Sequence, residues 1–152
     1  RRLARRGELI THQKDKAVLT LMRLNKVLET DFLTVHEEQT LGELVKIIAK
    51  AKRNLFPVLN EERKLLGIVI LDDIREIMFN SELYATTKVK HLMTVPPAFI
   101  QTGDNMDEVM KKFEDTGAWN LPVVEDGKYV GFVSKSKIFS VYRRVLIHFT
   151  ED

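Results

Sequence analysis

The stretch "GIVILDDI" at residues 67–74 returns further along the chain as "GFVSKSKI" at residues 131–138. The glycine, the apolar residues after it and the closing isoleucine recur in register, whereas Ile70 and Asp73 of the first copy become Ser134 and Lys137 in the second. A short apolar run that leads into Asp or Ser is typical of a strand followed by a capped helix. The chain therefore contains one strand–helix junction twice, with different side chains at the positions best placed to touch a ligand.

The repeat extends upstream of this junction. "TLGELVKIIAKA" (40–51) and "NMDEVMKKFEDT" (105–116) each begin with a capping residue and carry glutamate three positions later, the pattern of a capping box. Apolar residues then follow at the spacing of one helix face, which predicts an amphipathic helix in each copy. The two apolar stripes are Leu41, Leu44, Val45 and Ile48, and Met106, Val109, Met110 and Phe113.

Apolar strands with a proline follow each helix, "LFPVL" at 55–59 and "NLPVV" at 120–124. Because proline has no N–H, we expect Pro57 and Pro122 on a strand edge or among the first strand residues. The turns "NEERK" and "EDG" lead back into the strands at 65–70 and 129–134, and Asp126-Gly127 is a strong hairpin signal. Helices are expected to begin at about Asp72 and Ser136. Short extended pieces at 31–35 and 97–100 open the copies.

Each unit thus has the order strand, helix, strand, strand, helix. A unit of about 50 residues buries too little apolar surface to be stable alone. We therefore expect an α/β (α+β) fold of two β-α-β-β-α repeats, packed sheet to sheet about a pseudo-twofold axis, with an additional helix at 14–24. The predicted divisions are a basic leader and helix (1–26), a first repeat (27–80), a linker with a short helical piece (81–91) and a second repeat (92–148).

The composition is that of a soluble globular protein, with 44% hydrophobic and 30% charged residues in a chain of 152. No apolar run approaches the roughly 20 residues that span a bilayer. Cysteine is absent, which excludes disulfides and favours a reducing compartment. Four arginines crowd the start, and two interpretations remain open: the cytoplasmic flank of a preceding membrane helix, or a solvated terminus. They are Arg1, Arg2, Arg5 and Arg6, and the missing initial Met predicts a fragment.

Catalysis and metal binding have little support in the sequence. The four histidines are scattered without a partner at i+4, and no nucleophile-elbow, P-loop or dinucleotide motif occurs. The pairs Glu37-Glu38 and Glu61-Glu62 are best interpreted as solvated charge. A net charge of +2, with acids and bases interspersed, argues against nucleic-acid binding. Trp119, the sole tryptophan, could stack an adenine or pack a core or an interface.

The ordered set "LFPVL…GIVILDDI" and "NLPVV…GFVSKSKI", each after a capped helix, resembles the cystathionine-β-synthase (CBS) domain, which usually occurs in tandem as a Bateman module. The resemblance covers about residues 27–145. Three stretches resemble, more specifically, the cytoplasmic C-terminal region of prokaryotic CLC chloride channels and transporters. These are "RRLARRGELITHQKDKAVLTLM", "LDDIREIMFNSELY" and "AWNLPVV…GKYVGFVSKSKIFSVYR".

The resemblance to CBS domains implies an adenine nucleotide (ATP, ADP or AMP) between the copies, with its ribose held by Ser/Thr and Asp of the pattern G-h-h-[ST]-x-x-D. Here the pattern is split, because Asp73 follows Ile70 while Ser134 precedes Lys137. Asp73 could hold a ribose and Lys137 a phosphate. Alternatively, Asp73 complements a helix dipole and Ser134 ends a strand. The implied ligand residues are Thr34, Val35, Phe56, Pro57, Asp73, Phe99, Ile100, Asn120, Leu121, Pro122, Ser134 and Lys137.

The functional expectation is a non-catalytic, cytosolic regulatory module of a CLC-type chloride channel or transporter. It would form a homodimer through its CBS repeats, lie at the cytoplasmic face of the cell membrane, and pass its ligand state to a covalently attached transmembrane domain. The alternative is the regulatory CBS pair of a soluble metabolic enzyme or of another transporter class. The sequence leaves open the nucleotide, the transported ion, channel versus exchanger, the sign of regulation and what precedes Arg1.

Overall fold

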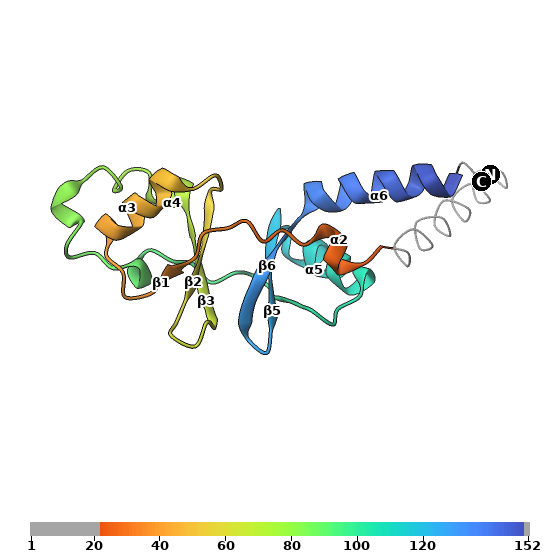
Figure 1. Ribbon diagram of the computed structural model, residues 1–152, viewed down its shortest axis with the longest axis horizontal. Helices are drawn as coiled ribbons and strands as arrows, with labels where there is room; N and C mark the ends of the chain where they lie inside the picture. Colours follow the sequence, from red (N-terminus) through yellow and green to blue (C-terminus); the bar gives the residue numbers. More distant parts are fainter. Residues whose placement is uncertain (1–21, 151–152) are drawn as a thin grey trace.

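Two three-stranded sheets lie next to each other at the centre of the computed structural model, which describes residues 22–150, with the helices on their outer sides (Figure 1). The first sheet has the order β1 (Val35–His36), β2 (Leu55–Leu59), β3 (Leu65–Ile70), and the second has the order β4 (Ile100–Gln101), β5 (Asn120–Glu125), β6 (Lys128–Ser134). In each sheet the first pair of strands is parallel and the second antiparallel. The predicted β-α-β-β-α repeat is confirmed, although only the last residues of the extended pieces at 31–35 and 97–100 join the sheets.

Helices separate and flank these strands. The described helices are α2 (Leu24–Val27), α3 (Leu41–Lys50), α4 (Leu71–Ile74), α5 (Met106–Thr116) and α6 (Lys135–Thr150), with 3-10 turns η1 (Ser81–Leu83) and η2 (Val89–His91). The sequence predicts one short helical piece between the repeats, and the structure has two 3-10 turns there. The helix predicted at residues 14–24 lies largely outside the described residues, and the arginine-rich start lies wholly outside them.

The capping signals begin α3 and α5 as predicted. Thr40 Oγ1 accepts a hydrogen bond from the Glu43 N–H at 3.2 Å, and the Glu43 carboxylate accepts one from the Thr40 N–H, which completes the capping box. In α5, Asn105 Oδ1 accepts from the Glu108 N–H at 2.8 Å. The apolar stripes face the sheets: the residues fully or nearly fully buried are Leu41, Leu44, Met106, Val109 and Phe113.

Of the two places predicted for the prolines, the strand edge is wrong, because β2 and β5 are the central strands, whereas a place among the first strand residues agrees with the structure. Pro57 and Pro122 lie third in these strands, opposite Ile68 and Phe132. The missing N–H is tolerated because the parallel neighbours are short: β1 pairs with β2 only from Val58, and β4 pairs with β5 only from Val123. Each proline thus stands just before the central strand gains its second partner.

The hairpin turns follow the sequence signals. Asp126 and Gly127 both have positive φ, 53° and 79°, in a two-residue turn closed by the pair Glu125 and Lys128. In the longer first turn, Asn60 Oδ1 accepts hydrogen bonds from the N–H groups of Glu62 (2.9 Å) and Lys64 (3.0 Å). The turn chemistry therefore fixes the register of both hairpins.

The two strand–helix junctions, at residues 67–74 and 131–138, differ from the prediction in the residue at which each helix begins. The helices begin at Leu71 and Lys135, one residue before Asp72 and Ser136. In the second copy, Ser134 Oγ accepts a hydrogen bond from the Lys137 N–H at 3.1 Å, so the hydroxyl of Ser134 satisfies an N–H at the start of α6. Ile70 has no hydroxyl to do the same, and α4 is a single turn.

Each sheet gains a short edge segment from the chain that opens the other repeat. Thr94 pairs with Ile68 of β3 through two backbone hydrogen bonds of 2.8 Å, and Glu29 pairs with Phe132 of β6 through bonds of 2.8 and 2.9 Å. The repeated glycines stand beside these crossings. A Cβ on Gly67 would lie 2.9 Å from the Thr94 carbonyl oxygen, and one on Gly131 would lie 2.6 Å from that of Glu29.

A local twofold relation joins the two hairpins. Lys64 and Lys128, which hold equivalent places in the repeats, form an antiparallel bridge. The Leu65 N–H donates to the Gly127 carbonyl at 3.0 Å and the Tyr129 N–H donates to the Arg63 carbonyl at 3.1 Å, and interchange of the repeats converts one bond into the other. A small apolar core closes this contact between the sheets. It contains Leu59, Leu65 and Val124, with Phe99 and Tyr129 packed against them.

Candidate functional site

Half of the residues implied as ligand contacts are core residues. Val35 and Phe56 are buried with the first repeat's helices, and Ile100 and Leu121 with those of the second. Pro57 and Pro122 are buried as well. Because the side chains of these six residues are buried inside the repeats, their backbone atoms are the groups left to contact a ligand. Thr34 and Phe99 are half-buried, and Asn120 is exposed at the start of β5.

Asp73 of the first repeat is exposed in the first turn of α4. Its neighbour Asp72 forms an exposed ion pair with Arg75, at 2.7 Å. Ile70 supplies no hydroxyl beside these carboxylates. The arrangement suits a helix start, where carboxylates complement the positive end of the backbone dipoles.

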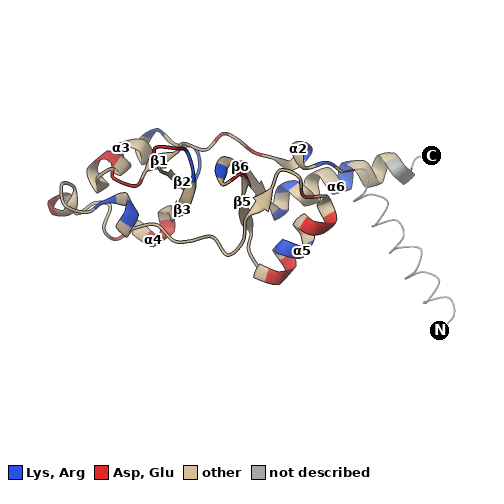
Figure 2. Cartoon of the chain, turned by 90° about the horizontal axis from the view of Figure 1, so that it is seen from below, with Lys and Arg blue, Asp and Glu red and all other residues tan. Residues whose placement is uncertain are grey.

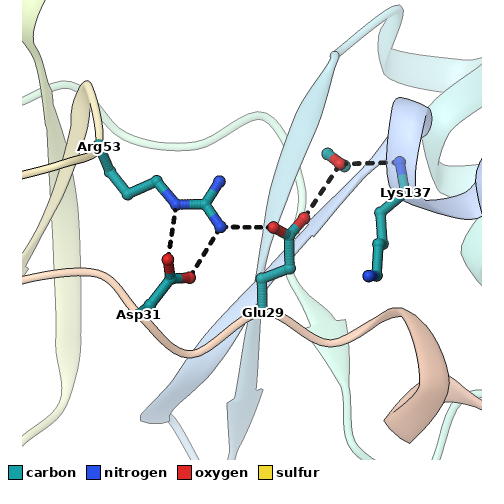
Figure 3. Close-up of polar contacts among 5 residues, drawn as sticks. Glu29, Asp31, Arg53 and Lys137 are labelled. Carbon is teal, nitrogen blue, oxygen red and sulfur yellow. Dashed lines mark hydrogen bonds and ion pairs between the residues drawn. The ribbon is translucent and has the colours of Figure 1, made fainter.

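Ser134 of the second repeat lies in a polar cluster that joins the two repeats (Figure 3). Its hydroxyl donates to Glu29 Oε1 at 3.2 Å while it accepts from the Lys137 N–H at 3.1 Å. Glu29 Oε2 accepts from Arg53 Nη2 at 2.6 Å. Arg53 also donates from Nε to Asp31 Oδ2 at 3.0 Å and from Nη2 to Asp31 Oδ1 at 2.8 Å. We call Glu29, Asp31, Arg53 and Ser134 the inter-repeat cluster.

Three separate elements position this cluster. Arg53 comes from the loop between α3 and β2, and Ser134 ends β6. Glu29 and Asp31 belong to the segment between α2 and β1, and the backbone pairing of Glu29 with Phe132 brings that segment beside β6. We call this segment, residues 28–34, the exchanged segment. The cluster therefore depends on the exchanged segment, and it connects side chains from both repeats.

The electrostatics of the cluster favour its ionised form. Arg53 faces two carboxylates, and its hydrogen bonds to Asp31 and Glu29 raise its pKa. The hydrogen bond from Arg53 lowers the pKa of Asp31. The Glu29 side chain is 19% exposed and that of Arg53 is 34% exposed, so this ion pair is better shielded from water than a surface pair.

Aromatic side chains line the cluster on one side. The Arg53 guanidinium lies 4.8 Å from the centroid of the Phe32 ring, and the ring centroids of Phe32 and Phe132 are 4.6 Å apart. Tyr129 lies next, 5.9 Å from Phe132. Burial raises the pKa of Tyr129, whose hydroxyl is buried without a hydrogen-bond partner among the described residues. The surface between the sheets thus combines apolar rings with charged groups.

Two predicted contacts have unexpected positions. Lys137 is half-buried, and its backbone N–H donates to the Ser134 hydroxyl. Figure 3 shows its side chain running away from the hydrogen-bonded groups. Trp119 is 71% exposed, with the Lys135 ammonium 5.1 Å from its ring centroid. The interpretation of Trp119 as a core residue is therefore wrong, whereas adenine stacking and packing at an interface both stay predictions.

The sequence analysis missed Glu29, Asp31 and Arg53. A usable signal existed, because "LNKVLET" (24–30) and "VKHLMTV" (89–95) occupy the same place before the two copies, and the turns α2 and η2 lie at equivalent positions within them. The match between these two stretches indicates that residues 28–30 belong to the repeated unit. It does not reveal that this segment pairs with the other repeat.

Two surface hollows lie away from the inter-repeat cluster. One of about 610 Å³ is formed by residues 22–25 and 102–107, and one of about 420 Å³ is lined by residues 36–38 and 60–62. The second brings Glu37, Glu38, Glu61 and Glu62 together. Within residues 22–150 no group of three or more His, Cys, Asp or Glu side chains has a metal-binding arrangement. Figure 2 shows acidic and basic residues interspersed along both repeats.

The fold and the duplicated unit agree with the comparison to protein families. The model of the CBS domain matches the chain twice, at residues 24–80 and 89–144. The chain therefore belongs to the CBS-domain family and contains a tandem CBS pair. No helix in the described part of the chain is long and apolar enough to cross a membrane.

Sequence relatives include several enzymes. The chain is 36% identical over 109 residues to inosine-5'-monophosphate dehydrogenase of Bifidobacterium longum, which covers 69% of this chain and 19% of that protein. It is 25% identical over 118 residues to homoserine O-acetyltransferase of Methanococcus vannielii, which covers 76% of this chain and 24% of that protein. The chain thus spans about a quarter or less of the length of these relatives.

Solved structures share the fold at low identity. CbpB in complex with c-di-AMP matches with a TM-score of 0.72 and 20% identity, covering 91% of this chain and 96% of CbpB. The CBS domain of a membrane protein from Sphaerobacter thermophilus has a TM-score of 0.72 at 19% identity, covering 89% and 96%. The ATP complex of the CBS domain of a bacterial CNNM/CorC Mg²⁺ transporter has a TM-score of 0.70 at 14% identity, covering 88% and 97%.

Proposed function

We propose that this CBS pair is a non-catalytic regulatory module that binds an adenine nucleotide between its repeats, at Ser134. The observation that carries the proposal is the inter-repeat cluster, in which Ser134 of one repeat is joined through Glu29 to Arg53 of the other. A ligand at this point touches both halves, so it can favour one relative arrangement of them. The segment that carries Glu29 would transmit the change toward the N-terminal side of the chain.

The second junction, from β6 into α6, is better suited to nucleotide binding than the first junction, from β3 into α4. Ser134 supplies a hydroxyl at the start of a helix of 16 residues, where the positive end of the backbone dipoles favours a phosphate. The first junction has Ile70 in the same place and a helix of 4 residues. Two structural neighbours are complexes with c-di-AMP and with ATP, which supports the choice of an adenine nucleotide.

The parent protein in this proposal is a CLC-type chloride channel or transporter, with the module at the cytoplasmic face of the membrane and paired with its twin. The resemblance of three stretches to that family supports the parent. The exposed apolar side chains of Phe79, Trp119 and Phe139 offer surface for a second copy. The dehydrogenase relative at 36% identity favours a second candidate, the regulatory part of a soluble enzyme. About 20 apolar residues encoded directly before Arg1 would support the first parent, and a soluble domain there the second.

Isothermal titration calorimetry with ATP, ADP, AMP and c-di-AMP tests the proposed binding. We expect at least one of them to bind at millimolar concentration or below. Ser134→Ala should weaken the affinity about five- to tenfold, since one hydrogen bond contributes about 1 kcal/mol. Asp73→Ala is the matched control and should leave the affinity unchanged.

Three results would contradict the proposal: no binding by any of these nucleotides, unchanged affinity in Ser134→Ala, or loss of affinity only in Asp73→Ala. Because Ser134 also caps α6, far-ultraviolet circular dichroism of the variant must match the parent before affinities are compared.

A further inference from the structure

The second junction lacks a carboxylate at position 137, where the family pattern has Asp, yet the structure supplies one from elsewhere. Glu29 is 105 positions from Ser134 in the sequence, and its Oε1 accepts the Ser134 hydroxyl hydrogen at 3.2 Å. A hydroxyl and a carboxylate therefore stand side by side at this junction, as the pattern requires. They come from β6 and from the exchanged segment that pairs with it.

Glu29 retains capacity to accept further hydrogen bonds. An ionised carboxylate has about four lone-pair directions on its two oxygens. The Ser134 hydroxyl uses one on Oε1 and Arg53 Nη2 uses one on Oε2, so one direction remains on each oxygen. Two adjacent O–H groups, such as the 2′ and 3′ hydroxyls of a ribose, can fill these two directions together.

The carboxylate is held in place before any ligand arrives. The Glu29 backbone exchanges hydrogen bonds of 2.8 and 2.9 Å with Phe132, and Arg53 fixes Oε2. The Glu29 side chain is 19% exposed, which leaves an approach for a ligand. A group that is already ordered loses little conformational entropy on binding, so its hydrogen bonds contribute more to affinity.

Positive charge lies next to this carboxylate. The described contacts of Arg53 use Nε and Nη2 and leave Nη1 for another acceptor. The start of α6 adjoins Ser134 on the other side, where the Lys137 backbone N–H donates to the Ser134 hydroxyl. The phosphate oxygens of a nucleotide whose ribose lies at Glu29 would face Arg53 on one side or the start of α6 on the other.

We propose that Glu29 is the acceptor of the ribose diol of the nucleotide at Ser134 and replaces the carboxylate that position 137 lacks. Arg53 orients Glu29 and faces the phosphates. This inference rests on the proposed nucleotide function and adds a specificity-determining residue to it. It also explains how ligand binding affects the exchanged segment, since Glu29, which accepts the hydrogen bonds of the diol, lies on that segment.

Calorimetry with ATP and 2′,3′-dideoxy-ATP tests the role of Glu29. The parent protein should bind ATP about tenfold more tightly than the dideoxy analogue. Glu29→Gln should bind ATP only as tightly as the parent binds the dideoxy analogue. The affinity of the variant for the dideoxy analogue should equal that of the parent. Glu114→Gln, at an exposed carboxylate of α5, is the matched control and should behave as the parent does.

The outcomes separate the inference from the proposed function. If ATP binds the parent and Glu29→Gln alike, the diol assignment is wrong while nucleotide binding stands. Tighter ATP binding by Glu29→Gln would also overturn the assignment and make Glu29 a competitor of the ligand. If the parent binds no nucleotide, both fall. Glu29→Asp, which keeps the charge but withdraws it by one methylene, gives the same test if Glu29→Gln fails to fold.

Discussion

At the scale of single residues, the repeated glycines show how a sequence motif can record a contact with a distant segment. Gly67 and Gly131 occur at the same place in both copies, and each lies under the backbone of a segment from the other repeat's opening. A side chain at these positions would meet a carbonyl oxygen, which cannot rotate away. The motif alone predicts a scaffold glycine, but the crossing segment is remote in sequence and only the structure reveals it.

Gly131→Ala should therefore destabilise the protein. The new Cβ would lie 2.6 Å from the Glu29 carbonyl oxygen and 3.0 Å from Leu28 Cδ1, so the exchanged segment must shift. Overpacking of this kind costs about 1–3 kcal/mol of unfolding free energy, measurable by urea denaturation. Gly103→Ala, whose Cβ would have no neighbour within 4 Å, is the control and should change little. Equal stability of the two variants would refute this account of the motif.

At the scale of elements, an ion-pair network holds the loop between β1 and α3 to the segment around η2. Glu38 accepts hydrogen bonds from Lys88 at 2.8 Å and from Lys90 at 3.0 Å. These bonds lower the pKa of Glu38 from its ordinary 4.5 to about 2. A carboxylate whose pKa is lowered by folding stabilises the folded state above its ordinary pKa, and the contribution fades as the pH falls toward the lowered value.

Glu38→Gln should accordingly lower the melting temperature slightly at pH 7. The difference from the parent should narrow as the pH falls from 4.5 to about 2, where Glu38 itself becomes protonated. Because the network is exposed, salt should shrink the difference at pH 7 as well. The control is Glu114→Gln, at an exposed residue of α5. A melting difference that is independent of pH and salt would contradict the electrostatic explanation.

The helices and strands also show how much of the structure can be predicted from the sequence. The capping residues and apolar stripes predicted α3 and α5 closely, because both signals are local. The helix starts after β3 and β6 were predicted one residue late, since Asp72 and Ser136 look like caps while the hydroxyl that caps α6 belongs to Ser134. Three of the four residues of the inter-repeat cluster escaped prediction. Their grouping depends on a pairing between segments far apart in the chain, which no local pattern encodes.

At the scale of the whole molecule, the exchange makes the repeats interdependent. Val89 of η2 is fully buried in the core of the first repeat, and Val27 of α2 is fully buried in the core of the second. The edge segments follow the same rule, since Thr94 pairs with β3 and Glu29 with β6. Figure 1 shows α2 beside β6 and α5, at the opposite end of the molecule from α3. Each core is thus completed by residues at or just before the opening of the other repeat.

Separation of the chain after residue 85 should therefore unfold both halves. The fragment 1–85 loses Val89 and the Thr94 edge, and the fragment 86–152 loses Val27, the Glu29 edge and the Lys64–Lys128 bridge. Circular dichroism should show little native structure in either fragment, because a core of this size is marginal even when complete. An equimolar mixture should regain the spectrum and a cooperative melt. If one fragment alone melts cooperatively near the temperature of the intact chain, the exchanged segments are dispensable, and a ligand-driven change at Glu29 would have no route from one half to the other.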